Sequence, residues 1–329
     1  MFPTRCQSPL IRGRAPPITP REQTASRTRS RRPPILTPHA KAFALATVLA
    51  AAGVAAWLSH SETPARHGSG APAAAARHPN RARYAWEITG VNVARIGHAD
   101  PVLARKLFGT SASFGLGNPA GHQDQVPGGS AAVPTLVYRS LTRFRADVRH
   151  GRIDPRIRAV LYDPERWRAT PLAEQRDPLE AMRRFAAFGH AHGYEVVLAP
   201  ARDLLAVAGA RCTAHGEPLD QAYLRCGLAR AARWADVFSI QSQADEFDVA
   251  AFRAFVRAAA GQARAAHPGV RVFAGISTDP ATGRARSSDL AEAVRSVQST
   301  VDGFWANVFA THPGQLQTAI AAFRTIARR

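Results

Sequence analysis

The sequence predicts an α/β protein, a (β/α)8 barrel of the TIM type, over residues 84–329. Short apolar segments alternate with amphipathic helical segments from Tyr84 to the C-terminus, which is the pattern of parallel βαβ units in one sheet. Seven strand candidates and one possible eighth favour a closed barrel over an open doubly wound sheet. No G-x-G-x-x-G follows the first candidate and no G-x-x-x-x-G-K-[ST] occurs in the chain, which argues against a dinucleotide or P-loop fold.

The strand candidates are short runs of apolar and β-branched residues, each followed by turn-forming or polar residues. In chain order they cover residues 84–93, 134–139, 157–162, 194–199, 237–243, 270–277 and 301–308, with 111–116 as the possible eighth. The candidate at 157–162 ends at Pro164, which has no backbone N–H to continue a strand ladder.

Helix candidates follow the strands. Asp177 and Pro178 are typical of a helix start, with Asp as the N-cap and Pro in the first turn, and Gly193 ends that helix. Ser287 or Ser288 is expected to cap a helix that runs to Val297. The other candidates cover 101–108, 141–150, 219–234, 249–266 and 313–327.

The first 83 residues are expected to lie outside the barrel. Residues 1–41 hold nine Lys or Arg and one acid, and we expect a disordered basic cytoplasmic tail. Residues 42–58 are an uncharged apolar run, either an uncleaved membrane anchor or a signal h-region, and residues 59–83 are a flexible linker. Both alternatives place the barrel outside the cell, on a single-pass membrane protein or secreted. No aromatic residues interleave with the arginines, so nucleic acid is not an expected partner.

The positions of two cysteines are consistent with an exported protein. Cys212 and Cys226 both fall in the predicted barrel, and a disulfide closing the loop between them would stabilise the fold by roughly 3 kcal/mol. Neither cysteine has the close partner spacing that zinc sites use, so no metal site is expected. No cofactor motif is present, and no cofactor is expected.

Polar side chains follow the strand candidates where each one ends. In a barrel, the carboxyl ends of parallel strands meet at one mouth, so residues far apart in sequence are expected to become neighbours there. These residues are Tyr138, Arg139, Asp163, Glu165, Arg202, Asp203, Gln241, Gln243, Glu246, Ser277, Asp279, Trp305 and Asn307.

Carboxylates, amides and indoles at one mouth are typical of sugar chemistry, in which an acid protonates the glycosidic oxygen and indoles stack on sugar faces. We expect an exported protein that binds, and in the stronger hypothesis hydrolyses, a carbohydrate or cell-envelope polymer. Glu165 is the expected acid, with Asp163 or Glu246 as the second carboxylate. The expected substrate-binding residues are Tyr138, Trp167, Gln241, Gln243, Asp279, Trp305 and Asn307.

Structural, non-catalytic roles are the alternatives for these residues. Glu165 could pair with Arg166, Arg168 or Arg176 on a surface loop. Glu174 and Gln175 fit helix-start chemistry before Asp177. The barrel could be a non-catalytic envelope-binding or structural module, and a metal-assisted hydrolase is a weaker alternative because no H-E-x-x-H occurs.

Two short motifs, Leu161-Tyr-Asp-Pro-Glu165 and Gly303-Phe-Trp305, resemble barrel glycoside hydrolases of the chitinase type. That resemblance implies Glu165 as the acid and the acetamido group of the substrate as the nucleophile. This chain departs from that family in Pro164 and in lacking further aspartates upstream. More broadly, residues 138–308 are similar to exported actinobacterial barrel proteins of unassigned activity, with YDPE-W, TP-x-x-EQ-x-DP, IQ-x-Q-x-x-E and DG-x-W-x-N segments. This second resemblance implies the barrel fold.

Overall fold

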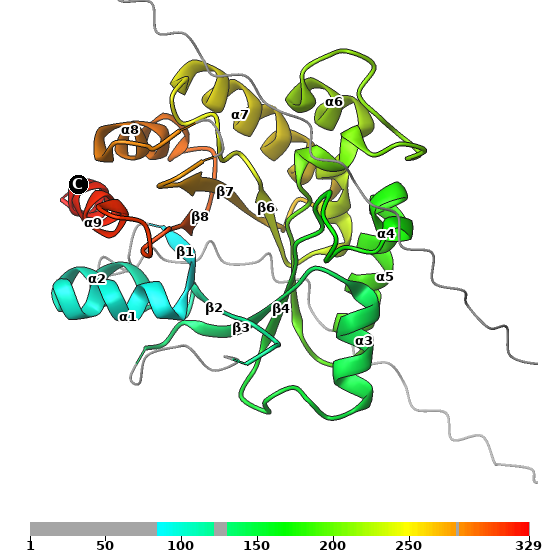
Figure 1. Cartoon of the computed structure of the whole chain (residues 1–329), viewed down its shortest axis with the longest axis horizontal. Helices are drawn as coiled ribbons and strands as arrows, with labels where there is room; N and C mark the ends of the chain where they lie inside the picture. The colour runs from blue at the N-terminus through cyan, green and yellow to red at the C-terminus, as the bar shows by residue number, and fades with distance from the viewer. Residues whose placement is uncertain (1–83, 122–129, 281–282, 329) are drawn as a thin grey trace, which may run out of the picture. The chain divides into compact units, whose positions relative to one another are not determined.

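A computed structural model describes residues 84–121, 130–280 and 283–328, and these form a closed barrel of eight parallel strands (Figure 1). The strands pair in sequence order, and β8 pairs with β1 to close the barrel. The predicted (β/α)8 fold class is therefore confirmed, and the possible eighth strand is real. The strands are β1 (Ala85–Thr89), β2 (Phe114–Gly117), β3 (Val133–Tyr138), β4 (Ala159–Tyr162), β5 (Glu195–Leu198), β6 (Val237–Ile240), β7 (Arg271–Ser277) and β8 (Gly303–Asn307).

Helices surround the strands (Figure 1). Asp or Ser side chains cap the first turns of α3, α5 and α7 by accepting backbone N–H groups, which explains where those helices begin. The α-helices are α1 (Gly90–Ala99), α2 (Pro101–Phe108), α3 (Leu141–Arg149), α4 (Leu172–Arg176), α5 (Pro178–Ala191), α6 (Leu219–Cys226), α7 (Val249–Ala266), α8 (Ser287–Val297) and α9 (Gln315–Ala327), and the 3₁₀ helices are η1 (Arg202–Ala206) and η2 (Leu228–Trp234).

Several expected elements differ in the structure. The N-cap of α8 is Arg286, and not Ser287 or Ser288 as expected. The first strand ends at Thr89, whose side chain accepts from the Asn92 N–H and starts helix α1, although Val91 and Val93 favour a strand. The expected helix at 219–234 is divided at Gly227, which has a φ of 69°. That left-handed conformation is one that glycine adopts readily, and it commonly ends a helix.

Side chains alternate between two cores because successive residues of a strand point to opposite faces. The outer core lies between strands and helices and includes Trp86, Tyr162 and Phe304. The inner core fills the barrel and includes Phe114 and Phe273. As the strand alternation predicts, Phe238 and Ile240 pack outward, whereas Ser239 faces the barrel interior.

The disulfide between Cys212 and Cys226 is confirmed, with their Cα atoms 5.9 Å apart. It ties the loop after η1 to the last residue of α6. The tail, apolar segment and linker expected at 1–41, 42–58 and 59–83 lie outside the described residues. Within 84–121, 130–280 and 283–328, no helix is long and apolar enough to cross a membrane.

Candidate functional site

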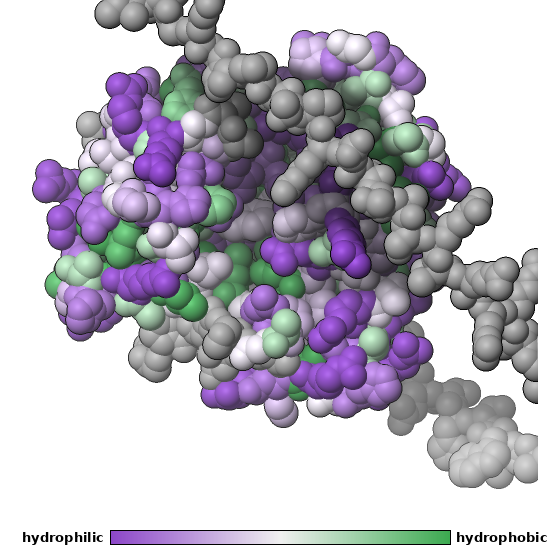
Figure 2. Space-filling model, viewed as in Figure 1, coloured by the Kyte–Doolittle hydropathy of each residue, from purple (hydrophilic) through white to green (hydrophobic). Residues whose placement is uncertain are grey.

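A cavity of about 1020 Å³ lies at the carboxyl ends of the strands. Figure 2 shows the same face of the molecule as Figure 1, with hydrophilic residues around a hollow near its centre. Most residues expected at the mouth do line this cavity: Arg139, Asp163, Glu165, Trp167, Arg202, Asp203, Gln241, Gln243, Ser277, Asp279, Trp305 and Asn307. The structure therefore brings together side chains from at least five strand ends.

The loop after β4 carries the carboxyl pair. The Asp163 N–H donates to the Tyr138 carbonyl oxygen at 2.8 Å, so the ladder runs one residue beyond the strand before Pro164 interrupts it. Asp163 is buried, whereas Glu165 is partly exposed. The two carboxyl groups influence each other's protonation: the interaction with Glu165 lowers the pKa of Asp163, and Asp163 raises the pKa of Glu165.

The electrostatics of this pair follow from burial. Loss of solvent is the largest cause that raises the pKa of Asp163 to about 7 and that of Glu165 to about 8, and the negative charges of Asp163 and Asp203 contribute to the rise for Glu165. Arg139 lowers both pKa values, and its Nε lies 4.0 Å from Asp163 Oδ2. Two adjacent carboxyl groups that disfavour double ionisation share one proton near neutral pH.

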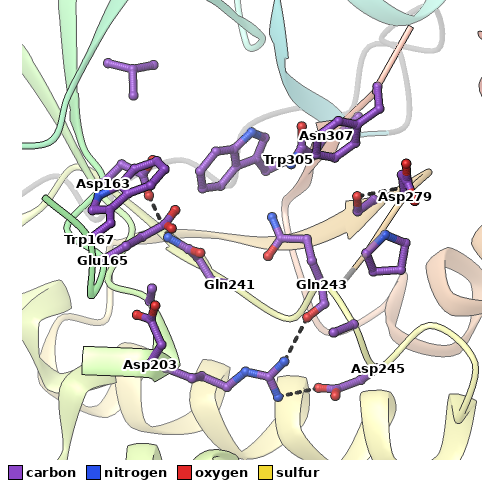
Figure 3. A pocket seen from close by; sticks show the side chains of 18 of the residues that line it. Asp163, Glu165, Trp167, Asp203, Gln241, Gln243, Asp245, Asp279, Trp305 and Asn307 are labelled. Carbon is purple, nitrogen blue, oxygen red and sulfur yellow. Dashed lines mark hydrogen bonds and ion pairs between the residues drawn. The ribbon is translucent and has the colours of Figure 1, made fainter. Parts of the chain in front are cut away.

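Side chains around the pair fix its surroundings (Figure 3). The Gln241 side-chain amide donates to Asp163 Oδ1 at 2.6 Å and to the Ala199 carbonyl at 2.7 Å. The Arg139 guanidinium lies 4.4 Å from the centroid of the Trp167 ring. Trp167 is 37% exposed, so its indole is accessible for stacking on a ligand.

The Gln243 amide packs against a glycine of β7. A Cβ at Gly275 would lie 2.5 Å from the Gln243 side-chain carbon Cδ, so a larger residue there would displace this amide. The following residue, Ala244, has a φ of 89°, a strained conformation for a residue with a side chain. The turn is held by Arg202, which donates to the Gln243 carbonyl at 2.8 Å and pairs with Asp245 at 2.6 Å.

The far side of the cavity comes from β7 and β8. Trp305 lies between the Asp163–Glu165 pair and Asn307 in Figure 3. It packs against the inner core of the barrel, so its indole forms part of the cavity wall. Asp279 accepts a hydrogen bond from His312 Nδ1.

Two expected site residues do not reach the cavity. Tyr138 is buried on the outer face of β3, where its hydroxyl donates to Asp147 at 3.3 Å. The expected position is wrong because Tyr138 ends its strand pointing toward the helices. Glu246 is fully buried and accepts backbone N–H groups from Ala244 at 2.7 Å and Ser277 at 2.6 Å. Its carboxyl group closes the turn after β6 and does not line the cavity, so the expected catalytic role of Glu246 does not fit its position.

Sequence reasoning missed other residues of this region. Asn118 and Asp245 line the cavity, and Asn118 could have been found as the polar residue directly after the possible eighth strand. Glu87 was also missed. It lies inside the barrel with both carboxyl oxygens 2.7 Å from the Ser239 hydroxyl, and the alternation of Trp86 and Ile88 in β1 signals its inward position.

Glu174 and Gln175 have roles beyond starting a helix. Glu174 accepts from the Tyr162 hydroxyl at 2.6 Å and from the Leu141 N–H at 2.9 Å, joining β4 to the start of α3. Gln175 donates to two carbonyl oxygens of the loop after β4, those of Trp167 and Thr170. Within the described part of the chain, no three His, Cys, Asp or Glu side chains gather as a metal site would require.

Comparison with known proteins does not assign this chain to a family. No protein-family model and no curated protein matches the chain. A Bacteroides thetaiotaomicron protein put forward as an alpha-L-fucosidase matches 56% of this chain and 59% of its own, with 12% identity and a TM-score of 0.39. The carboxyl transferase domain of Rhizobium etli pyruvate carboxylase with 3-hydroxypyruvate matches 76% of this chain and 47% of its own, with 13% identity and a TM-score of 0.40. This chain thus spans about half the length of both, and its barrel fold is established by its own strand order.

Proposed function

We propose that this protein binds a carbohydrate in the cavity at the barrel mouth and hydrolyses a glycosidic bond, with Glu165 as the general acid. The proposal depends mainly on one observation: two neighbouring carboxyl groups, those of Asp163 and Glu165, both line a cavity of about 1020 Å³. An acid with a pKa raised to about 8 keeps its proton at neutral pH, and a general acid needs that proton to protonate a leaving oxygen.

The cavity wall supports a sugar as the ligand. The indoles of Trp167 and Trp305 both line the cavity, and flat aromatic surfaces suit the apolar faces of sugar rings. The amides of Gln243 and Asn307 offer donors and acceptors for hydroxyl groups, and Gln241 offers its carbonyl oxygen because its amide nitrogen already donates to Asp163 and Ala199. A hydroxyl-rich ligand could replace the water that hydrogen-bonds to these groups in the open cavity.

The spacing of the pair favours one type of mechanism. Inverting enzymes separate their carboxyl groups by roughly 6.5–9.5 Å and retaining enzymes by roughly 5–5.5 Å. Asp163 and Glu165 lie two residues apart on the loop after β4 and influence each other's pKa, so we place them side by side and not across a bound sugar. The pair therefore fits a mechanism in which Glu165 protonates the leaving oxygen and an acetamido group of the substrate, oriented by Asp163, attacks the sugar carbon.

The proposed substrate is a polymer of the cell envelope or its surroundings. Cys212 and Cys226 form a disulfide, and disulfides persist mainly in exported proteins. We extend the proposal to a barrel held outside the cell by residues 42–58, or secreted after their removal.

A substitution pair tests the proposal. In the full-length chain, Glu165→Gln removes the acidic proton with little change in shape, so release of reducing sugar from envelope polysaccharides should fall by about 10²- to 10⁴-fold, while ligand affinity stays within a few-fold. The control is Glu87→Gln, which alters a second buried acid that does not line the cavity and should leave turnover unchanged.

Two results would contradict the proposal. Full turnover in Glu165→Gln would exclude this residue as the acid. Saccharide binding without any turnover in the unchanged protein would instead support the non-catalytic binding module.

A further inference from the structure

The loop that carries the candidate acid has no regular secondary structure of its own. Residues 163–171 connect β4 to α4 through bends and turns, yet the carboxyl group of Glu165 and the indole of Trp167 must both face the cavity. A displacement of about 1 Å at a catalytic group can cost about 100-fold in rate. The hydrogen bonds that hold this loop therefore bear on the chemistry proposed above.

One hydroxyl group joins the two cavity-facing residues. Thr170 is 1% exposed, and its side-chain oxygen accepts from the Glu165 backbone N–H and from the Trp167 indole N–H, each at 3.2 Å. The Thr170 N–H in turn donates to the Trp167 carbonyl oxygen at 3.2 Å. The loop is thus closed on itself around Thr170, which does not line the cavity.

Gln175 fixes this closed loop to the helix that follows. Its side-chain amide donates to the Thr170 carbonyl at 2.6 Å and to the Trp167 carbonyl at 2.8 Å, and the residue is buried. Removing the amide would leave two loop carbonyls without this donor, which is costly in a buried place. Neither Thr170 nor Gln175 lines the cavity.

A second anchor holds the support itself. The neighbouring Glu174 accepts from the Tyr162 hydroxyl, at the end of β4, and from the Leu141 N–H, at the start of α3. Helix α4 is therefore tied to the barrel by Glu174 and to the loop by Gln175. This gives the Glu-Gln pair of the TP-x-x-EQ-x-DP segment a purpose other than starting a helix.

We infer that Thr170 and Gln175 are positioning residues: they hold the loop after β4 so that the Glu165 carboxyl group meets Asp163 and the Trp167 indole faces the ligand. They act through the loop and touch neither ligand nor reacting atoms. This inference rests on the proposed function for its catalytic consequence, whereas the placement of Glu165 can be measured without turnover.

The variants are chosen so that each loss has a matched control. Thr170→Val removes the hydroxyl and keeps the shape, and Thr170→Ser keeps the hydroxyl. Gln175→Leu removes the amide donor. The control for Gln175 is Gln262→Leu, because the Gln262 amide also donates to a backbone carbonyl, that of Leu224 at 3.0 Å, but does so away from the cavity.

Two quantities are measured in the full-length chain. The first is kcat on an envelope saccharide, which should fall about tenfold in Thr170→Val and Gln175→Leu and stay within twofold in Thr170→Ser and Gln262→Leu. The second is the pKa of the Glu165 carboxyl, followed by NMR of carbon-13-labelled glutamate. In Thr170→Val and Gln175→Leu it should fall toward the ordinary glutamate value, because a released loop separates Glu165 from Asp163 and exposes it to water.

The outcomes separate this inference from the proposed function. If the Glu165 pKa and kcat in Thr170→Val and Gln175→Leu match those of Gln262→Leu, with only the melting temperature lowered, the positioning role is wrong. If the unchanged protein turns over no saccharide but the pKa moves as expected, the proposed hydrolysis fails and the positioning of Glu165 stands. A variant that does not fold is replaced by Thr170→Ala, whose smaller side chain cannot overpack the loop.

Discussion

Two glutamates of the barrel, Glu87 and Glu165, have similarly raised pKa values and differ in their access to a ligand. Glu87 lies inside the barrel, where burial raises its pKa to about 8, and Glu165 lies at the mouth with a pKa raised to about 8 by the same cause. Glu87 is fully enclosed with Ser239 as its partner, whereas Glu165 lines the cavity. A raised pKa therefore reports a dry environment, and an open path to a ligand is what makes it useful for chemistry.

The surroundings of Glu87 show how a barrel accommodates an acid without using it. Loss of solvent is the largest influence on its pKa, and Ser239 and Arg271 lower that pKa only in part. Arg271 itself pairs with Glu195 and lies over the Phe114 ring. Glu87 is thus expected to be protonated and neutral at physiological pH, as a structural hydrogen-bonding group.

Asp163→Asn should give the largest effect in this comparison. The substitution keeps an oxygen that can accept from Gln241 but removes the negative charge that raises the pKa of Glu165. Turnover should fall by about 10- to 100-fold, and the alkaline limb of the pH–rate profile should move to lower pH. A profile that keeps its alkaline limb in place would show that the two carboxyl groups are not coupled.

Ser239→Ala should reduce stability and leave turnover unchanged. It removes the hydroxyl that lies 2.7 Å from both Glu87 oxygens, and an unsatisfied buried acid costs about 1–3 kcal/mol. Urea unfolding measures this loss, with saccharide turnover at saturating substrate as the control. A fall in turnover without a fall in the free energy of unfolding would show that Glu87 influences catalysis at the cavity, and the contrast between Glu87 and Glu165 would then be wrong.

Glu87→Gln should give the smallest change at low pH and a growing one as pH rises. Folding raises the pKa of Glu87 from 4.5 to about 8, so its contribution to stability is complete below about pH 4.5 and is lost as pH rises through about 8. Between these values the folded state binds more protons than the unfolded state, and stability falls by at most about 1.4 kcal/mol per pH unit. Between pH 5 and 8, the melting temperature should decline less steeply in Glu87→Gln than in the unchanged protein. An identical decline would show that Glu87 is not the group whose proton release lowers stability.

Much of the fold could be predicted because it depends on local pattern. Apolar runs such as 159–162, ended by Pro164, mark strands without any knowledge of their partners, and parallel topology then places strand ends together. Helix α1 was not predictable in this way. Val91 and Val93 favour a strand, and the helix begins there because Thr89 caps it.

The site was predictable in its membership and less so in its geometry. Residues directly after a strand, such as Asp163, lie at the mouth because the strand fixes their direction. Glu246 lies six residues beyond β6, after a turn with a positive φ at Ala244, and its return to the backbone of Ser277 depends on that turn. Hydrogen bonds across the barrel, such as Glu87 with Ser239, join residues whose pairing no local pattern records.

The disulfide between Cys212 and Cys226 restrains part of the cavity wall. Pro218, Leu219 and Asp220 contribute to the cavity wall, and they lie on the stretch of chain bounded by Cys212 and Cys226. The disulfide thus restrains one side of the entrance. A reductant would make this segment more mobile without changing Glu165. Ligand affinity should accordingly depend on whether the protein folds in an oxidising or a reducing compartment.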